Sequence, residues 1–180
     1  RAVGHRGPYR LRSDPASEYL RSGYVLLRRE QTLENLVLLA DFWKDVYSQN
    51  EDRFSVDVLK RLFVLNYAPN SLWTYIVSVY FMHYKNAENM LDNEKFYLFL
   101  NRLIGFIWAY AISNPGITAL RAPVFNEMVN IIENKEIAFE NYLFQEELFR
   151  SQFTNFSFSN TRAITKSMIM WWAFSFDSQE

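Results

Sequence analysis

Histidine is the first side chain to consider, because it serves as proton shuttle and as metal ligand. The chain has two histidines and no cysteine. His5 lies in a stretch with glycine and proline at the amino terminus, and His83 lies among Phe81, Met82 and Tyr84 near the end of an expected helix. His83 has no nearby carboxylate at metal-ligand spacing, so we interpret it as a structural histidine. Without cysteine, disulfides and thiolate metal sites are excluded.

Two acidic pairs are the remaining candidates for metal binding, because carboxylates four residues apart share one face of a helix. These are Asp41 with Asp45 and Glu136 with Glu140. No Glu-x-x-His repeat of a helical-bundle metal site accompanies them, so a solvated helix face is the preferred interpretation. The sequence also lacks a glycine-rich phosphate loop and a Gly-x-Ser-x-Gly nucleophile elbow. We therefore predict no catalytic residue, no metal site and no cofactor in this chain.

Positive charge is concentrated at the amino terminus. Residues 1–30 carry seven arginines against Asp14, Glu18 and Glu30, a net charge of +4 in a chain whose total is −1. An arginine-rich arm can contact phosphate, although polar chain ends are also often basic without a specific partner. The candidate DNA contacts are Arg6, Arg10, Arg12, Arg121, Arg162 and Lys166.

The elements that would position these residues are helices, and the longest apolar helical period runs over residues 93–113. A helix so apolar, about 30 Å long at 1.5 Å per residue, must be enclosed by other elements. Its one narrow polar or small stripe consists of Asn101, Arg102, Gly105 and Ala109. Glycine costs about 1 kcal/mol relative to alanine inside a helix. Gly105 therefore predicts that another helix packs closely on the stripe, and exposure of the stripe to solvent is the alternative.

Caps and helix breakers divide the rest of the chain into further helices. The expected ranges are about 16–23, 32–48, 56–68, 72–84, 123–134, 137–148 and 161–176, while residues 153–158 are expected to be extended or irregular. The expected caps are Ser55, Ser71, Asp92 and Asn160 or Thr161. We predict an all-α fold, an irregular bundle of about seven to eight helices around a buried central helix at about 93–112. Residues 1–30 would form a basic arm with a short helix, and residues 31–180 a single helical domain.

Composition bounds the class of protein. With 180 residues, 49% hydrophobic and 18% aromatic, the chain can bury a sizeable core. Its longest apolar run, residues 103–112, is far shorter than the roughly 20 residues of a membrane-spanning helix. The absence of cysteine fits a reducing compartment, so we expect a cytoplasmic location. Because the chain begins with Arg1 rather than Met, we expect it to be a piece of a longer protein.

Four stretches of sequence resemble a known family. They are LNYAPNSLWTYIVSVYFMHY, EKFYLFLNRLIGFIWAYAI, LRAPVFNEMVNII and TRAITKSMIMWWAF, within residues 65–176. Together they look like the helical middle region of the GmrSD-type restriction endonuclease family. In that family a ParB-like N-terminal domain is associated with nucleotide hydrolysis, and a His-Asn-His C-terminal domain with cleavage of modified phage DNA. Neither domain's motif is present here, so the resemblance carries over no catalytic residue.

The resemblance implies a noncatalytic helical scaffold within a nucleotide-dependent, modification-directed DNA endonuclease of phage defence. This chain would then not be an enzyme by itself, and its partners would be the flanking domains of the parent protein. One alternative is a free-standing helical module that binds another protein. The other is a helical DNA-binding domain that uses Arg121, Arg162 and Lys166 together with the basic arm.

Overall fold

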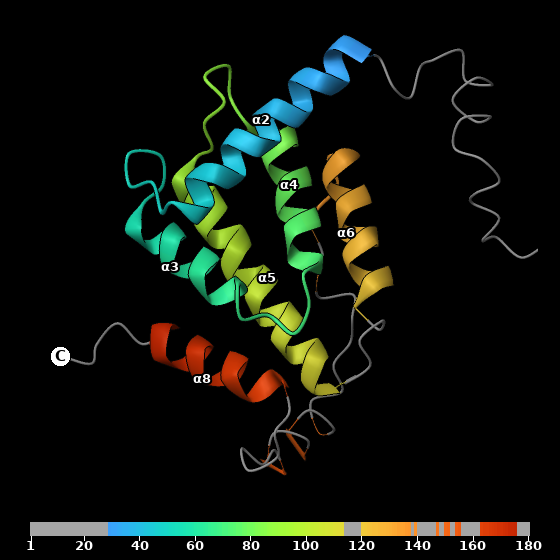
Figure 1. The fold of residues 1–180 in the computed structure, drawn as a ribbon. Helices are drawn as coiled ribbons and strands as arrows, with labels where there is room; N and C mark the ends of the chain where they lie inside the picture. Colours follow the sequence, from blue (N-terminus) through green and yellow to red (C-terminus); the bar gives the residue numbers. More distant parts are fainter. Residues whose placement is uncertain are drawn as a thin grey trace, which may run out of the picture. The chain divides into compact units, whose positions relative to one another are not determined.

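A computed structural model describes residues 29–113, 120–137, 139, 147, 150–151, 154–155 and 163–175. The described residues form six α-helices and no strand (Figure 1). The helices are α2 (Arg29–Tyr47), α3 (Val56–Leu65), α4 (Leu72–Tyr84), α5 (Asn93–Ser113), α6 (Arg121–Ile132) and α8 (Ala163–Ser175). The predicted all-α class is therefore confirmed. None of these helices combines the length and the apolar character needed to cross a lipid bilayer.

The number of helices differs from the prediction. Six are seen in the described residues, not seven to eight, because the expected helix at 16–23 and nearly all of the one at 137–148 lie outside those residues. Most of the stretch 153–158 lies outside them as well. The chain divides into two compact units, Arg1–Trp43 and Lys44–Glu180. The predicted arm at 1–30 and single domain at 31–180 stay a prediction.

Local capping explains where several helices begin. Ser55 is the N-cap of α3, and its hydroxyl accepts a hydrogen bond from the amide of Val58. Asp92 precedes α5, and its carboxylate accepts from the amides of Glu94 and Lys95. Ser71 lies where α4 begins, as predicted, but its side chain makes no capping hydrogen bond. The side chains at these two predicted caps, Ser55 and Asp92, therefore satisfy amide groups that the first turn leaves without helical partners.

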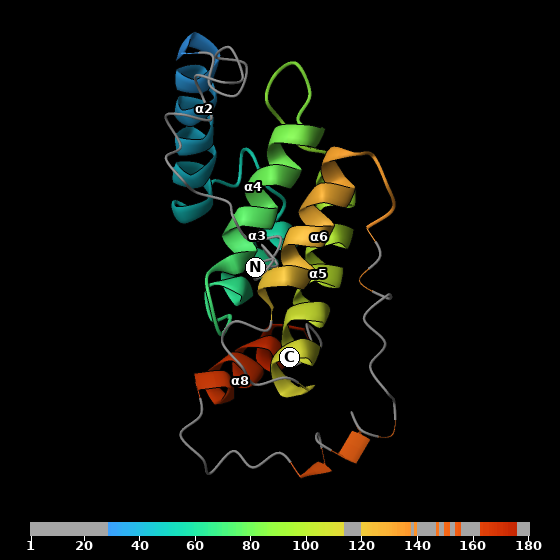
Figure 2. The ribbon, with the colours of Figure 1, turned by 90° about the vertical axis from the view of Figure 1, so that its right-hand side faces the viewer.

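The second unit, Lys44–Glu180, is built from pairs of packed helices. Within it α4 and α6 lie side by side, α3 packs along α5, and α8 packs on α3 (Figures 1 and 2). Aromatic contacts join α4 to α5, where the rings of Tyr80 and Phe99 stack with centroids 4.0 Å apart. A second aromatic contact joins α5 to α8, where the rings of Trp108 and Trp171 are 6.2 Å apart.

Helix α5 contributes eight buried residues: Phe96, Phe99, Leu100, Leu103, Ile104, Phe106, Ile107 and Trp108. Trp108 is fully buried, and its indole N–H has no hydrogen-bond partner among the described residues. On the other side of α5, Leu98 and Arg102 are exposed. Buried aromatic and aliphatic side chains thus alternate with an open side at helical spacing.

The close contact predicted at Gly105 is not found. No described atom outside the local helix backbone lies within 4 Å of the position that a Cβ would take on Gly105. Gly105 itself is partly exposed. The alternative interpretation, exposure of the stripe, agrees with the open space at Gly105, whereas Asn101 on the same stripe accepts a hydrogen bond from Arg61 of α3.

Candidate functional site

The structure describes two of the six candidate DNA contacts. Arg121 is the first residue of α6, and Lys166 lies near the start of α8; both side chains are exposed. The four others, Arg6, Arg10, Arg12 and Arg162, lie outside the described residues. The two described cations belong to different helices, and no hydrogen bond or ion pair among the described residues connects them. Their role in DNA binding stays a prediction.

His83 and the acidic pairs form no metal centre in the part of the chain that the structure describes. His83 Nε2 lies 2.8 Å from Asn134 Oδ1, and because an amide oxygen only accepts, the imidazole donates this hydrogen bond. Glu140 lies outside the described residues. No group of three or more histidine, aspartate or glutamate side chains in the described ranges could hold a metal ion.

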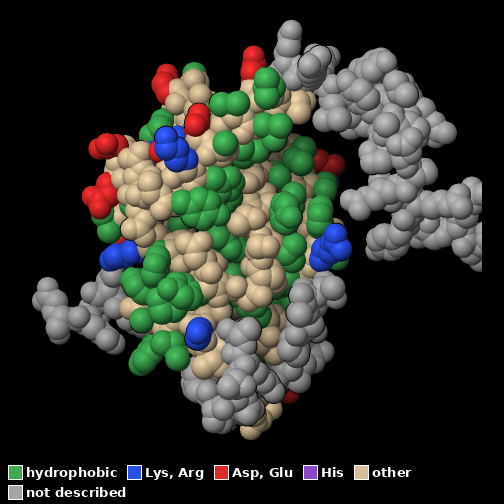
Figure 3. Space-filling model, in the orientation of Figure 1, with side chains coloured by type: hydrophobic (Ala, Val, Ile, Leu, Met, Phe, Trp, Pro, Cys, Tyr) green, Lys and Arg blue, Asp and Glu red, His purple; other side chains and the backbone are tan. Residues whose placement is uncertain are grey.

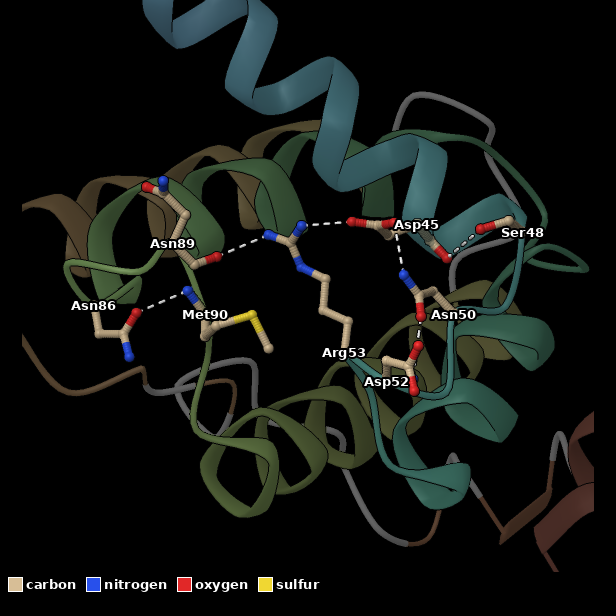
Figure 4. Close-up of polar contacts among 8 residues, drawn as sticks. All are labelled: Asp45, Ser48, Asn50, Asp52, Arg53, Asn86, Asn89 and Met90. Carbon is tan, nitrogen blue, oxygen red and sulfur yellow. Dashed lines mark hydrogen bonds and ion pairs between the residues drawn. The ribbon is translucent and has the colours of Figure 1, made fainter.

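Asp45 instead forms a clamp with Arg53, which lies in the loop before α3 (Figure 4). One guanidinium nitrogen of Arg53 donates to Asp45 Oδ2 at 2.5 Å, and another donates to the carbonyl of Asn89 at 2.7 Å. Asn89 belongs to the loop between α4 and α5 and has a positive φ of 59°, a conformation that asparagine tolerates better than most residues. Arg53 therefore ties two loops together that are 36 residues apart.

The carboxylate of Asp45 is stabilised in its charged form. Asn50 Nδ2 donates a hydrogen bond to Asp45 Oδ1 at 2.9 Å. This hydrogen bond, followed by the hydrogen bond and charge of Arg53, holds the pKa of Asp45 below its ordinary value, although partial burial opposes the shift. Asp45, which we considered as half of a metal-binding pair and interpreted as part of a solvated helix face, is thus engaged with an arginine and an asparagine.

A second arginine, Arg61 of α3, joins three helices from a buried position. Its side chain donates from Nε to Asn101 Oδ1 at 2.5 Å, from Nη1 to the carbonyl of Phe174 at 3.1 Å, and from Nη2 to the hydroxyl of Tyr97 at 3.3 Å. None of the described acidic residues forms an ion pair with Arg61. Phe174 lies in the last turn of α8, where the helix dipole is negative. Neutral oxygens and the end of a helix therefore compensate this buried charge.

The outer face of α6 is apolar, contrary to the usual pattern of a solvent-facing helix. Phe125, Val129 and Ile132 follow one another at helical spacing and are 47%, 48% and 59% exposed. The charged residues of α6 are Arg121 at its start and Glu127, which is only 2% exposed. Figure 3 shows hydrophobic side chains at the surface over α6, with few charged ones among them. We call Phe125, Val129 and Ile132 the α6 face.

A pocket of about 400 Å³ lies between α4, α5 and the residues that follow α6. Its floor includes Tyr80, Phe99 and Phe139, each less than 8% exposed, while Lys95 and Arg102 of α5 line it with charged groups. Burial, followed by the nearby Tyr84 and Asp92, raises the pKa of Tyr80 to about 12. The shift therefore keeps the phenol protonated to a higher pH than an exposed tyrosine.

Comparisons with protein-family models, curated proteins and solved structures found no match to this chain. The resemblance to the GmrSD-type family consequently stays a prediction.

The α6 face and the pocket were not predicted from the sequence. The α6 face had a signal, because apolar residues at positions 125, 129 and 132 are interrupted by no exposed charge. The pocket had none, because its walls come from α4, α5 and the residues after α6, which span positions 80–139.

Proposed function

We propose that this chain is a noncatalytic helical scaffold, organised around α5, that packs against a neighbouring protein domain through the α6 face. Following the resemblance, that domain belongs to a nucleotide-dependent, modification-directed DNA endonuclease. The observation that carries the proposal is the exposure of Phe125, Val129 and Ile132 along a helix face without exposed charge. Contiguous exposed apolar surface is characteristic of protein interaction sites.

The two arginine clamps support a scaffold role. The guanidinium groups of Arg53 and Arg61 donate hydrogen bonds to other groups of the same chain, among them Asp45, Asn89 and Asn101. These contacts hold loops and helices in place relative to one another inside the second unit. A scaffold needs this internal rigidity, because a partner docked on a rigid surface loses less conformational freedom elsewhere.

The α6 face also favours a protein partner over DNA. Affinity for the DNA backbone requires cations that neutralise phosphates, whereas the only exposed charge within α6 is Arg121 at its first residue. A DNA-binding domain is the alternative function, and the exposure of Arg121 and Lys166 supports it.

The test compares variants of the purified chain with separately produced flanking domains of the parent protein. We expect Phe125→Glu combined with Val129→Glu to weaken binding to a flanking domain at least tenfold, measured by calorimetry. Tyr75→Glu is the matched control, because Tyr75 is an aromatic residue on α4 that is 57% exposed. Unchanged binding in the double variant would contradict the role of the α6 face.

A second arm addresses DNA and catalysis. The scaffold proposal predicts that the purified chain neither cleaves DNA nor hydrolyses nucleotides. It also predicts that the double variant Arg121→Glu with Lys166→Glu has the same affinity for DNA as the wild type. Salt-dependent DNA binding that this pair of substitutions removes would favour the alternative. Cleavage abolished by a point substitution in the chain would refute the noncatalytic assignment.

A further inference from the structure

The pocket between α4, α5 and the residues after α6 has the size of a small-molecule site. Its volume of about 400 Å³ lies in the range of about 300 to 1,000 Å³ typical of ligand pockets. Its aromatic floor is preorganised, because the rings of Tyr80 and Phe99 stack with an interplanar angle of 15°. Phe139 is held similarly by Phe106, with centroids 4.8 Å apart.

Tyr80 places a polar group in this apolar floor. The residue is 7% exposed, and no described group forms a hydrogen bond with its hydroxyl. A phenol keeps its proton at neutral pH, so the hydroxyl can donate to a ligand as well as accept. Trp108 Nε1 is the buried polar side-chain atom without a partner among the described residues, so the Tyr80 hydroxyl reaches solvent and is open to a ligand in the pocket.

Charged groups lie at the mouth of the pocket. Lys95, Phe99 and Arg102 follow one another on α5 at spacings of four and three residues, so they share one helix face. Lys95 Nζ is 3.9 Å from Asp92 Oδ2, and the two side chains are 78% and 55% exposed. A pair this long and this exposed contributes little, so an anion can compete with Asp92 for Lys95. Among the described residues that line the pocket, Lys95 and Arg102 are cations and Asp92 is a carboxylate.

We propose that this pocket binds a small molecule that combines a planar aromatic ring with an anionic group. The ring lies against the aromatic floor and meets the Tyr80 hydroxyl, and the anion lies at Lys95. An aromatic carboxylate and an aromatic phosphate share this chemistry. The site is separate from the α6 face, since none of Phe125, Val129 and Ile132 lines the pocket.

The probe is 1-anilinonaphthalene-8-sulfonate, a fluorescent aromatic anion, and its neutral counterpart is N-phenyl-1-naphthylamine. We expect one binding site for the anion in the purified chain, with affinity reduced at least tenfold by Lys95→Glu. Lys166→Glu makes the same charge change at an exposed residue of α8 and should leave the affinity within twofold. The neutral probe should bind with equal affinity to all three proteins.

Two further measurements locate the site and identify the acid. Val129→Glu should not change binding of the anionic probe, because Val129 belongs to the α6 face; a loss in this variant would place the probe there and overturn the proposal. Displacement of the probe by 2-naphthoate or by 2-naphthyl phosphate would support the site and distinguish a carboxylate from a phosphate ligand. Failure of both compounds, or equal effects of Lys95→Glu and Lys166→Glu, would overturn it.

Discussion

The guanidinium Nη1 of Arg61 donates a hydrogen bond to the backbone carbonyl of Phe174, which is 3.1 Å away and 113 residues later in the chain. The same contact is reinforced by packing, because the rings of Phe63 and Phe174 have centroids 4.9 Å apart. Nearer the start of α8, the hydroxyl of Ser167 donates to the carbonyl of Tyr67. Helix α8 is thus attached to α3 and the turn after it by side chains that reach backbone carbonyls.

Arg61→Met should destabilise the protein by about 1 to 3 kcal/mol. Methionine keeps much of the aliphatic stem but removes the donors to Asn101 and Phe174, which leaves acceptors unsatisfied. Arg61→Lys should also destabilise, because an ammonium cannot replace a planar fork of donors. Urea unfolding measures both effects, with Arg121→Met, at an exposed position, as control within about 0.5 kcal/mol of wild type. An unchanged midpoint in Arg61→Met would show that the clamp contributes no stability.

Gly105→Ala should stabilise the protein by about 1 kcal/mol. The open space at the Cβ position means that alanine gains helix propensity without a clash. The reciprocal substitution, Ala109→Gly one turn later, should lower the free energy of unfolding by a similar amount. If the midpoint of Gly105→Ala falls instead, another segment packs closely on this stripe, as the sequence alone had predicted.

Asp45→Asn should reduce stability at pH 7 by about 1 to 2 kcal/mol, because the ion pair with Arg53 is lost while the guanidinium stays partly buried. The pKa of Asp45 is lowered in the folded state, so its contribution is present above the unfolded value near 3.8 and is lost as the pH falls through the folded pKa. The difference between wild type and Asp45→Asn should therefore shrink below about pH 4. Asp52→Asn, at an exposed position, is the control, and a difference independent of pH would contradict the shift.

Tyr80→Phe tests the buried phenol at alkaline pH. The folded pKa of about 12 exceeds the ordinary value of 10.0, so ionisation favours the unfolded chain once the pH passes the unfolded pKa. The stability of wild type relative to Tyr80→Phe should fall by about 2 to 3 kcal/mol between pH 10 and 12. Urea unfolding up to the highest pH at which the chain folds reversibly measures this fall. Tyr75→Phe, at an exposed site, should show no such difference.

Local chemistry made much of the fold predictable from the sequence. The range of α4, the cap at Ser55 and the cap at Asp92 follow from short-range spacing, because a cap and the amides it satisfies lie within three residues. Ser71 shows the limit of that argument: its side chain makes no capping hydrogen bond, while its backbone carbonyl accepts from the amide of Thr74 and Asn70 Oδ1 accepts from the amide of Leu72.

Burial was harder to predict, because it depends on which neighbour each helix face meets. Glu127 is buried in α6, where Asn130 donates to its carboxylate at 3.2 Å, while Phe125 on the same helix is 47% exposed. Hydrophobicity alone suggests the reverse. The partner of Arg61 was equally hidden, because a backbone carbonyl 113 residues away leaves no mark in the residue types.

The buried indole of Trp108 is an intrinsic fluorescence probe of the fold. A tryptophan that is fully shielded and lacks a hydrogen-bond partner among the described residues emits at the short-wavelength edge of the spectrum, whereas Trp172, which is 63% exposed, emits toward the red. Of the five tryptophans in the chain, these two mark opposite extremes of solvent contact. Loosening of the contact between α5 and α8 would therefore shift the tryptophan emission to longer wavelength, without any attached dye.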